Sequence, residues 1–400
     1  MQHHRRAVGV RVAHLIESSG PGGAERVVAE LATSLQSAGT ENVVFLPFDG
    51  EDWLRKQLEG SGVSVEYFRI ERPVSPACAR TLIEAFRRQG IDVAHSHEFS
   101  MAVYGAWAAW RARIPHVITM HGGRYYAGRL RRRLALRAAL ALSAETVAVS
   151  ASLAAALSRD LSVKGSRILR IPNGVRYVPP ERVTLREELR LRPADRLIVS
   201  VGNLYPVKGH QYLVDALALI ADRHPALHVA IAGRGGQESA LRSLARNHGL
   251  ADRVHLLGLR ADVPAILAAA DVFVLPSLSE GLPLALIEAM FAGRPIVATD
   301  VGEVRAALAH GGAGVVVEPA DALALGVALD ALLQDPERAK ALGEQAARHA
   351  IAEYELSTMV RQYARVYEQA LGKPHDVLTR LSSCPKPSSH EDGVLKAGQG

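Results

Sequence analysis

The sequence predicts an α/β fold in which two Rossmann-like domains, each built on a doubly wound parallel sheet, face a cleft. Three observations predict this fold. Short apolar runs that are typical of buried strands alternate with helical segments along almost the whole chain. The 400 residues exceed what a single hydrophobic core usually serves. The alternation also restarts after a Pro-Asn-Gly break at residues 172–174, which divides the chain into two similar halves.

The N-terminal domain is expected over residues 1–175. Its apolar runs predict strands at residues 8–16, 43–48, 63–68, 91–95, 116–120 and 146–149. Helices are expected between them at residues 24–38, 53–59, 77–89, 101–112, 129–142 and 151–157. Strands joined through helices in this way run parallel.

The C-terminal domain is expected over residues 176–356. Its strands are expected at residues 197–201, 227–232, 254–257, 272–275, 295–298 and 314–317. Its helices are expected at residues 211–222, 238–248, 262–269, 284–291, 303–309, 321–333 and 336–352. A further helix is expected at residues 357–371. The tail, residues 372–400, is rich in Pro, Ser, Gly and Lys, which predicts disorder.

The composition argues against a disulfide scaffold, a zinc site and a membrane span. The two cysteines, Cys78 and Cys384, are far apart and lack metal-ligand spacing, as expected for a reduced cytoplasmic location. No stretch approaches the roughly 18 apolar residues of a spanning helix. The net charge is +6, and residues 99–144 contain many arginines without any Asp or Glu, so this block attracts anions.

The most informative segment runs from Ser279 to Met290 and places Glu280 and Glu288 eight positions apart. Glu280 follows a predicted strand, at the carboxyl end where open α/β sheets bind their ligands. The next helix begins near Pro283 and offers backbone amides to an anion. Glu288 lies about two turns further on, near the same helix face. The alternative is that Glu280 caps this helix and that Glu288 is a solvated helix residue.

Glycine-containing turns follow the first strand of each predicted domain. Residues 19–25 include Gly22 and Gly23, which let a ligand approach the backbone at the start of a helix. A tight turn without a ligand is the alternative. In the second half, Gly202, Asn203 and Lys208 occupy the corresponding turn.

The segment from Glu280 to Glu288 resembles the Glu-x7-Glu motif of retaining glycosyltransferases with the GT-B fold, of the family 4 (glycosyl transferases group 1) type. The resemblance covers nearly the whole chain except the tail. It implies an acceptor-binding N-terminal domain and a C-terminal domain that binds a nucleotide diphosphate sugar. It also implies a last helix that crosses back onto the N-terminal domain. The nucleotide sugar is a co-substrate, and the resemblance implies no further cofactor and no metal.

The resemblance also assigns roles in donor binding. Lys208 matches the lysine that neutralises the diphosphate, but Asn203 stands where the family usually has Arg. A neutral amide offsets no charge, so Arg234 is the candidate substitute, with a solvated turn residue as the alternative. The expected donor-binding residues are Gly22, Gly23, Gly202, Asn203, Lys208, Arg234, Arg260, Gly281, Leu282, Pro283, Leu284 and Glu288. Of these, Glu288 is expected to hold the ribose hydroxyls, and the segment of Arg260 to contact the base.

His121 and Glu280 are the expected catalytic residues. The resemblance implies that Glu280 orients the donor sugar and that His121, at the end of a strand, donates a hydrogen bond to a sugar hydroxyl. A structural His121 bonded to backbone is the alternative. His95 and His97 are expected in a loop, as structure or as acceptor contacts, because two histidines alone are a weak metal signal.

The basic segment Arg124–Arg137 has two expected partners. Its leucines fall on one helical stripe among arginines, which favours an anionic membrane surface on the inner face of the membrane. An acceptor that carries phosphate or uronic acid fits equally. The alternative is a solvated helix whose apolar stripe packs on the sheet.

The expected function is metal-independent transfer of a sugar, with retention, from a nucleotide diphosphate sugar to a glycan or lipid-linked acceptor. A cell-surface polysaccharide or glycolipid is the expected product. Two alternatives stay open, namely a nucleotide-sugar epimerase and a non-catalytic nucleotide-sugar binding protein. A P-loop, the Gly-x-Gly-x-x-Gly of dehydrogenases and the Asp-x-Asp of metal-dependent GT-A transferases are missing from the sequence. No nucleic-acid partner is expected.

Overall fold

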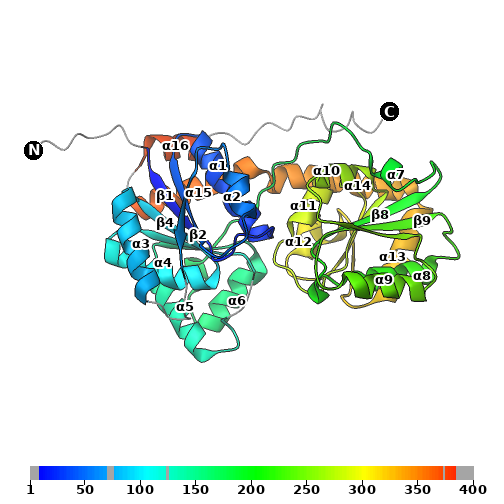
Figure 1. The fold of residues 1–400 in the computed structure, drawn as a ribbon, viewed down its shortest axis with the longest axis horizontal. Coiled ribbons are helices and arrows are strands. Elements are labelled where there is room, and N and C mark those ends of the chain that lie inside the picture. The colour runs from blue at the N-terminus through cyan, green and yellow to red at the C-terminus, as the bar shows by residue number, and fades with distance from the viewer. Residues whose placement is uncertain (1–8, 70–75, 123–125, 373, 384–400) are drawn as a thin grey trace, which may run out of the picture. The chain divides into compact units, whose positions relative to one another are not determined.

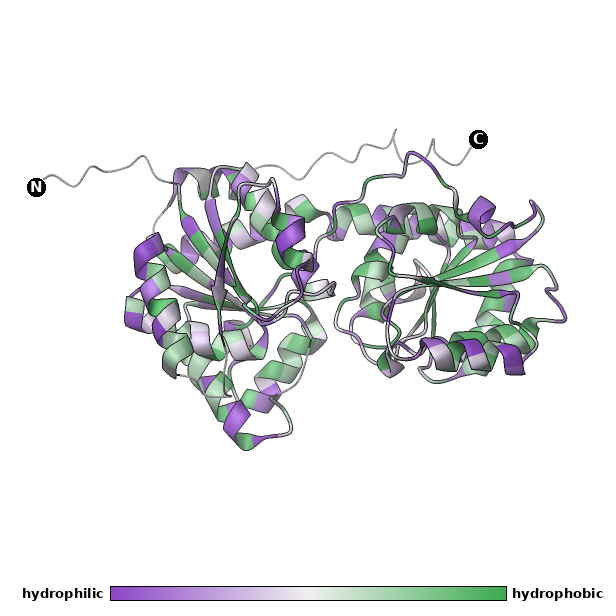
Figure 2. Cartoon of the chain, in the orientation of Figure 1, coloured by the Kyte–Doolittle hydropathy of each residue, from purple (hydrophilic) through white to green (hydrophobic). Residues whose placement is uncertain are grey.

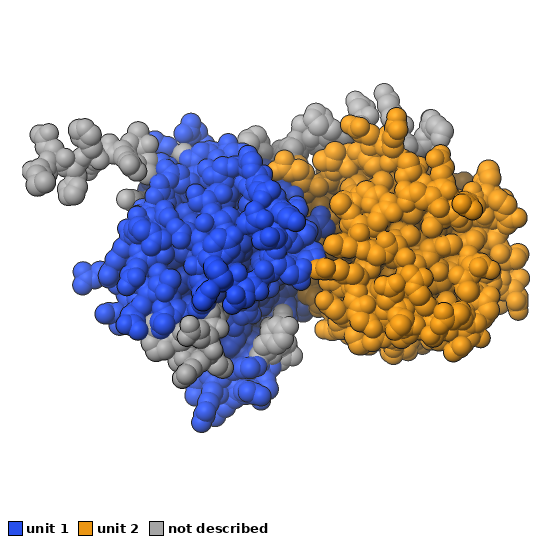
Figure 3. Space-filling model, viewed as in Figure 1, with its two compact units in different colours: residues 1–174, 356–400 blue, residues 175–355 orange. Residues whose placement is uncertain are grey.

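The computed structural model describes residues 9–69, 76–122, 126–372 and 374–383. The chain divides into two compact units (Figures 1 and 3). Unit 1 comprises Met1–Gly174 and Leu356–Gly400, and unit 2 is the intervening segment Val175–Glu355. Unit 2 is therefore inserted in the chain of unit 1.

Unit 1 is built on a seven-stranded sheet with the order β3-β2-β1-β4-β5-β6-β7, in which every pair is parallel. Its strands are β1 (Arg11–Leu15), β2 (Glu41–Pro47), β3 (Ser64–Phe68), β4 (Val93–His97), β5 (His116–Met120), β6 (Glu145–Ala148) and β7 (Leu169–Arg170). Its helices are α1 (Gly23–Ser37), α2 (Trp53–Leu58), α3 (Pro76–Gln89), α4 (Glu98–Ala112), α5 (Leu130–Leu142), α6 (Ala151–Leu161), η1 (Gly165–Arg167), α15 (Leu356–Leu371) and α16 (Asp376–Ser383).

Unit 2 is built on a six-stranded parallel sheet with the order β10-β9-β8-β11-β12-β13. Its strands are β8 (Arg196–Val201), β9 (Leu227–Ala232), β10 (Val254–Gly258), β11 (Val272–Leu275), β12 (Ile296–Thr299) and β13 (Val315–Val317). Its helices are α7 (Leu185–Glu188), η2 (Pro206–Lys208), α8 (His210–Ile220), α9 (Glu238–Asn247), α10 (Val263–Ala269), α11 (Leu284–Phe291), α12 (Val304–Ala307), η3 (Ala309–Gly311), α13 (Ala322–Gln334) and α14 (Pro336–Glu353).

These two sheets confirm the predicted α/β class. The strands are mostly hydrophobic because helices cover both faces of each sheet (Figure 2). Val199, Phe273 and Val297 in unit 2 are completely buried, as are Val12 and Val93 in unit 1. The short elements β7 and α7 were not predicted, because two to four residues carry too little hydrophobic periodicity.

The strand order reverses at one point in each sheet. Loops that carry candidate site residues lie at these points. In unit 1, β1 pairs with β4, and in unit 2, β8 pairs with β11. The loops that leave these neighbouring strands at their carboxyl ends diverge and leave a crevice. The glycine turn at residues 19–25 and His97 follow this rule in unit 1, and the loops that contain Lys208 and Glu280 follow it in unit 2.

Helix α15 belongs to unit 1, where it packs against α1, β4 and β5. The hydroxyl of Tyr363 lies 3.0 Å from Thr119 Oγ1, and the hydroxyl of Tyr367 lies 2.7 Å from His95 Nδ1. Both tyrosines are fully buried, so these bonds satisfy groups that have no access to water.

The expectation of disorder from residue 372 is wrong over Asp376–Ser383, which form α16. Helix α16 packs on α15, with Leu378 fully buried and Thr379 Oγ1 donating to Glu368. The composition predicted disorder because the tail is polar on average, whereas one buried leucine and a local hydrogen bond suffice for two turns on an existing helix. Residues 384–400, the rest of the predicted tail, lie outside the described residues.

Candidate active site

Glu280 sits in the loop between β11 and α11. Its Oε1 accepts hydrogen bonds from Ser277 Oγ at 2.7 Å and from Lys208 Nζ at 2.7 Å. The side chain is 9 % exposed and that of Lys208 is 27 % exposed. The helix cap is Pro283, which makes no side-chain capping bond, so Glu280 does not cap α11 as the alternative held. Its carboxylate is instead part of a partly desolvated ion pair.

The loop after β8 brings Lys208 to that carboxylate. Lys208 ends the short helix η2, and Leu278 N donates to Val207 O at 2.8 Å, which ties the two loops together. Gly209 has φ +64° and lies so close to Pro276 that a Cβ would overlap the Pro276 carbonyl oxygen. Only glycine fits this close approach without strain, so the spacing between Lys208 and Glu280 is fixed by backbone packing.

A second contact holds the backbone of Glu280. Gly302, at the start of the segment after β12, has φ +56°, and a Cβ there would overlap the carbonyl oxygens of Glu280 and Gly281. Glu303 N donates to Gly281 O at 2.9 Å. The Glu280 loop is therefore held from both sides, by the loop that follows β8 and by the segment that follows β12.

The N-terminus of α11 can accept an anion beside this pair. The first bond of the helix runs from Ile287 N to Pro283 O, so the amides of Leu284, Ala285 and Leu286 precede the helical hydrogen-bond ladder. Together with the helix dipole, such amides favour a phosphate or carboxylate. Leu282 packs its side chain into the core of unit 2, so it serves this site through the backbone alone.

Glu288 lies on the buried side of α11 and is 4 % exposed. The alternative of a solvated helix residue is therefore wrong. Its carboxylate contributes to raising the pKa of Tyr177, for which burial is the larger cause. The ring of Tyr177 stacks on Phe291, with 5.8 Å between the ring centroids. A buried carboxylate on this helix fits a ligand that offers hydroxyl donors.

The remaining donor candidates of unit 2 occupy neighbouring turns. Gly202 and Asn203 follow β8, and the carbonyl oxygen of Arg234 accepts a hydrogen bond from Leu204 N at 2.9 Å. A Cβ on Gly233 would overlap the Gly202 carbonyl oxygen. The turn that carries the exposed Arg234 is thus packed directly on the turn that carries Asn203.

The side chain of Arg260 is paired with two acids. Its guanidinium bonds to Asp262, with Nε at 2.7 Å from Oδ1, and to Glu188, with Nη1 at 2.8 Å from Oε2. These carboxylates raise the pKa of Arg260. The expected contact of the Arg260 segment with a base, through backbone groups, stays a prediction.

In unit 1, Gly22 and Gly23 stand at the start of α1. Gly22 is the cap residue, and a Cβ there would overlap the carboxylate of Glu25. That carboxylate accepts a hydrogen bond from Ser18 Oγ and is 7 % exposed. The Glu25 side chain folds back over the cap, so a larger residue in place of Gly22 would make this carboxylate shift. Gly23 has open space around its Cα.

His121 lies directly after β5 in a buried polar group. Its Nε2 is 3.0 Å from His97 Nδ1, and its backbone N donates to Glu98 Oε1 at 3.0 Å. Burial lowers the pKa of His121 to about 4 and raises the pKa of Glu98 to about 7. Among the described residues, His121 Nδ1, His97 Nε2 and Glu98 Oε2 have no hydrogen-bond partner. The alternative was a structural His121 that bonds through backbone. This holds for the backbone amide of His121, but its ring bonds to the imidazole of His97 instead.

The prediction that His95 and His97 lie in a loop is wrong, because both are fully buried in strand β4. The hydrophobic run seemed to end at His95, and a buried histidine in a strand carries no sequence signal of its own. His14 of β1, which the sequence did not single out, pairs in register with His95. Ligand atoms of these three histidines lie within 4.8 Å of one another. Both nitrogens of His95 are already bonded, to Thr119 Oγ1 and to the Tyr367 hydroxyl.

Helix α5 covers residues 130–137 of the basic segment, and Arg124 lies outside the described residues. The leucine stripe does not pack on the sheet as the alternative held. Leu130, Leu134 and Leu142 are 68 %, 57 % and 44 % exposed. Arg131 and Arg137 are exposed beside them. The face that α5 buries consists of Leu136, Ala139 and Leu140. The outer face of α5 is therefore both apolar and cationic.

The two parallel sheets and the site of unit 2 define a glycosyltransferase with the GT-B fold. Residues 181–349 match the family described as Glycosyl transferases group 1, and residues 21–177 match Glycosyltransferase Family 4. The chain belongs to this group 1 / family 4 type of glycosyltransferases.

Relatives agree with this assignment. The chain is 31 % identical over 331 residues to D-inositol 3-phosphate glycosyltransferase of Nocardia farcinica, covering 77 % of this chain and 71 % of that protein. It is 29 % identical over 365 residues to phosphatidyl-myo-inositol mannosyltransferase of Mycobacterium leprae, covering 87 % and 93 % of the two chains.

Solved structures share the fold. A glycosyltransferase from Rickettsia africae superposes with a TM-score of 0.82 at 20 % identity, over 92 % of this chain and 100 % of that chain. HepE from Anabaena, solved in complex with UDP, superposes with a TM-score of 0.78 at 24 % identity, over 89 % and 99 %. No helix within the described ranges is long and apolar enough to cross a membrane.

Proposed function

We propose that this glycosyltransferase moves a sugar, with retention of anomeric configuration, from a nucleotide diphosphate sugar to a glycan or lipid-linked acceptor. Assembly of a cell-surface polysaccharide or glycolipid is the proposed setting. The observation that carries the proposal is the Lys208–Glu280 pair beside the uncapped N-terminus of α11. Support for the donor class comes from HepE, which was solved with UDP-glucose.

In this proposal, Lys208 and the α11 amides neutralise the leaving diphosphate. When the donor binds, the Lys208 ammonium turns from Glu280 to a phosphate oxygen, since a charge-assisted bond to phosphate replaces the one to the carboxylate. The amides of Leu284 to Leu286 meet the other phosphate oxygens. Donors aimed in advance at developing negative charge lower the barrier without reorganisation during the reaction. The proposed reaction is therefore independent of a metal ion.

Glu280 is then free to accept hydrogen bonds from hydroxyls of the donor sugar, and Glu288 binds the ribose hydroxyls. The bond from the anomeric carbon to the phosphate oxygen breaks, and a bond to the acceptor oxygen forms on the same face. The departing phosphate oxygen takes the acceptor proton, so the nucleoside diphosphate carries it away. His121 is neutral at pH 7 and can donate a hydrogen bond to a sugar hydroxyl.

The test is thermal unfolding of the full chain with saturating UDP, GDP, ADP or TDP, each with and without EDTA. Ligand at about a hundredfold over its dissociation constant adds roughly 2.7 kcal/mol of stability. A shift with one nucleotide that EDTA leaves unchanged is the expected result. The absence of a shift with all four would overturn donor binding at this site, and a shift that EDTA abolishes would overturn metal independence.

We also propose that the outer face of α5 rests on an anionic bilayer. Exposed leucines alternate there with Arg131 and Arg137, so burial of the leucines in the interface and attraction to lipid phosphates act together. Flotation with vesicles of neutral lipid, and of neutral lipid mixed with phosphatidylglycerol, tests this. The full chain should float with anionic vesicles, and Leu130→Ser/Leu134→Ser should not. Equal recovery with both vesicle types would remove the proposal.

A further inference from the structure

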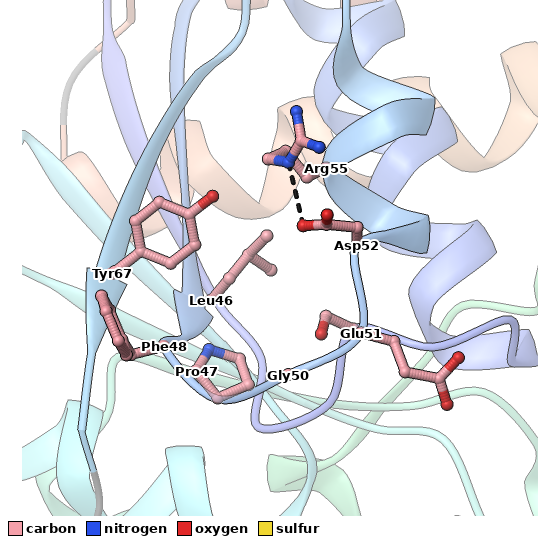
Figure 4. A pocket seen from close by; sticks show the side chains of 9 residues that line it. Leu46, Pro47, Phe48, Gly50, Glu51, Asp52, Arg55 and Tyr67 are labelled. Carbon is pink, nitrogen blue, oxygen red and sulfur yellow. Dashed lines mark hydrogen bonds and ion pairs between the residues drawn. The ribbon is translucent and has the colours of Figure 1, made fainter.

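Unit 1 contains a pocket of about 230 Å³ next to the glycine turn that follows β1 (Figure 4). One wall comes from the carboxyl ends of β2 and β3, with Phe48 and Tyr67. The opposite wall comes from the segment that leads into α2, with Glu51, Asp52 and Arg55. None of the donor-site residues of unit 2 lines this pocket.

The pocket is joined to the glycine turn by close backbone packing. Ser19, which belongs to that turn, also lines the pocket, and its carbonyl oxygen accepts a hydrogen bond from Leu54 N at 2.9 Å. A Cβ on Gly20 would lie 3.1 Å from Glu51 Oε1. The buried Ser19 Oγ has no hydrogen-bond partner among the described residues, although a buried hydroxyl normally has one. A ligand in the pocket can supply that partner.

The aromatic wall is unusually accessible. Phe48 is 57 % exposed and Tyr67 is 43 % exposed, and their rings meet edge to face with centroids 6.2 Å apart. Arg69 lies over the Phe48 ring, with its guanidinium carbon 4.1 Å from the centroid, and braces it. The fully buried Leu46 also lines the pocket. This wall offers an apolar surface to the carbon-bound hydrogens of a ligand ring.

The opposite wall carries a carboxylate, that of Asp52, and the guanidinium of Arg55. Asp52 Oδ1 accepts from Arg55 Nε at 3.0 Å, and this bond lowers the pKa of Asp52. The Arg55 guanidinium also donates to Glu59, with 2.5 Å between Nη1 and Oε1. The wall thus presents the Asp52 carboxylate and a guanidinium that is already paired. The hydroxyls of a neutral ligand find an acceptor there, whereas an anionic ligand would face the Asp52 carboxylate.

We infer that this pocket binds a neutral pyranose ring of the acceptor, with its apolar face against Phe48 and Tyr67 and its hydroxyls toward Asp52 and Ser19. The inference rests on the proposed transferase function and specifies its acceptor as a glycan that contains an uncharged sugar. It differs from the proposed α5 surface, which recognises negative charge.

The test is saturation-transfer NMR on the full chain with the methyl α-glycosides of glucose, mannose and galactose, and with methyl glucuronide as the charged probe. At least one neutral glycoside should receive saturation, and methyl glucuronide should receive less. In Tyr67→Ala and in Asp52→Asn the signal should fall about tenfold, the effect of losing roughly 1.4 kcal/mol of binding free energy. Trp110→Ala, which removes an exposed aromatic side chain elsewhere in unit 1, is the matched control.

Three outcomes would overturn the inference. They are no transfer to any of the neutral glycosides, equal transfer in the parent and in both pocket variants, and stronger transfer to methyl glucuronide. Asp52→Asn keeps the test decisive if Tyr67→Ala unfolds, because Asp52 is exposed. Nucleotide-induced thermal shifts of the same samples report on unit 2. Failure of those shifts counts against the transferase, and failure of sugar binding with the shifts intact counts against the pocket alone.

Discussion

The Lys208 ammonium lies 2.7 Å from Glu280 Oε1, although the two residues are 72 positions apart in the chain. While no donor is bound, the charges of these two side chains compensate each other. This compensation is needed because Glu280 is nearly buried. In the proposed reaction, the donor must therefore offer both a phosphate to Lys208 and hydroxyls to Glu280. A nucleotide sugar meets this requirement with one molecule, whereas a free nucleotide meets only half of it.

Lys208→Ala should weaken binding of the preferred nucleoside diphosphate by roughly tenfold to a hundredfold, because a charge-assisted phosphate bond is lost. Titration calorimetry measures the change directly. Lys208→Arg keeps the charge and should retain most of the affinity. Wild-type affinity in Lys208→Ala would show that another cation, such as Arg234, carries the diphosphate.

Glu280→Gln should retain nucleotide binding and lose sugar transfer by about two orders of magnitude, because a neutral amide accepts hydroxyl hydrogen bonds more weakly than a carboxylate does. Nucleotide release from the donor, followed with acceptor present, measures this. Unchanged turnover would argue that Glu280 is structural. Binding in both proteins without turnover in either would favour a nucleotide-sugar binding protein.

Gly302→Ala should lower the free energy of unfolding by more than about 2 kcal/mol, because strain at positive φ adds to overlap with the Glu280 carbonyl. It should also weaken nucleotide binding, since the Glu280 loop must shift. Gly311→Ala is the matched control. Its φ is +99° but its Cβ would meet nothing within 4 Å, so it should cost less and leave binding intact. Equal losses in both variants would contradict the packing argument.

Acid should destabilise the protein between pH 6.5 and 4. Burial lowers the pKa of His14, His121 and His210 to about 4 and that of His116 to about 3. The unfolded chain therefore binds protons below about pH 6.5, while the folded chain does not. The free energy of unfolding consequently decreases as the pH falls, by roughly 1.4 kcal/mol per pH unit for each of these histidines. Thermal unfolding at pH 7, 6 and 5 should show falling midpoints.

Glu98 should have the opposite effect on stability as the pH falls. Its pKa of about 7 exceeds the usual 4.5, so the folded chain holds an extra proton between these values and gains stability as the pH falls. Glu98→Gln removes that gain and should make the acid-induced drop steeper than in the parent. The exposed Glu353→Gln serves as the control. An identical pH profile for Glu98→Gln would mean that Glu98 is already ionised in the folded chain.

The sequence predicted that Lys208 and Glu280 follow strands and that Glu288 lies within a helix, because strand and helix periodicity is local. It did not predict that Lys208 and Glu280 bond to each other, since this depends on the pairing of β8 with β11. The same limit hid His14, whose neighbour His95 is set by the pairing of β1 with β4. The pairing of Arg260 with Glu188 was likewise not predictable, because the two residues are 72 positions apart.

The return of α15 to unit 1 sets an order for biosynthesis. Thr119 and His95 are translated early, yet their buried partners Tyr363 and Tyr367 leave the ribosome only after all of unit 2. The nascent N-terminal segment must wait without these two tyrosine partners, whereas unit 2 has its complete sequence available first. The later half of the gene therefore encodes the part that can finish folding earlier, and a premature stop before α15 would leave the first half permanently incomplete.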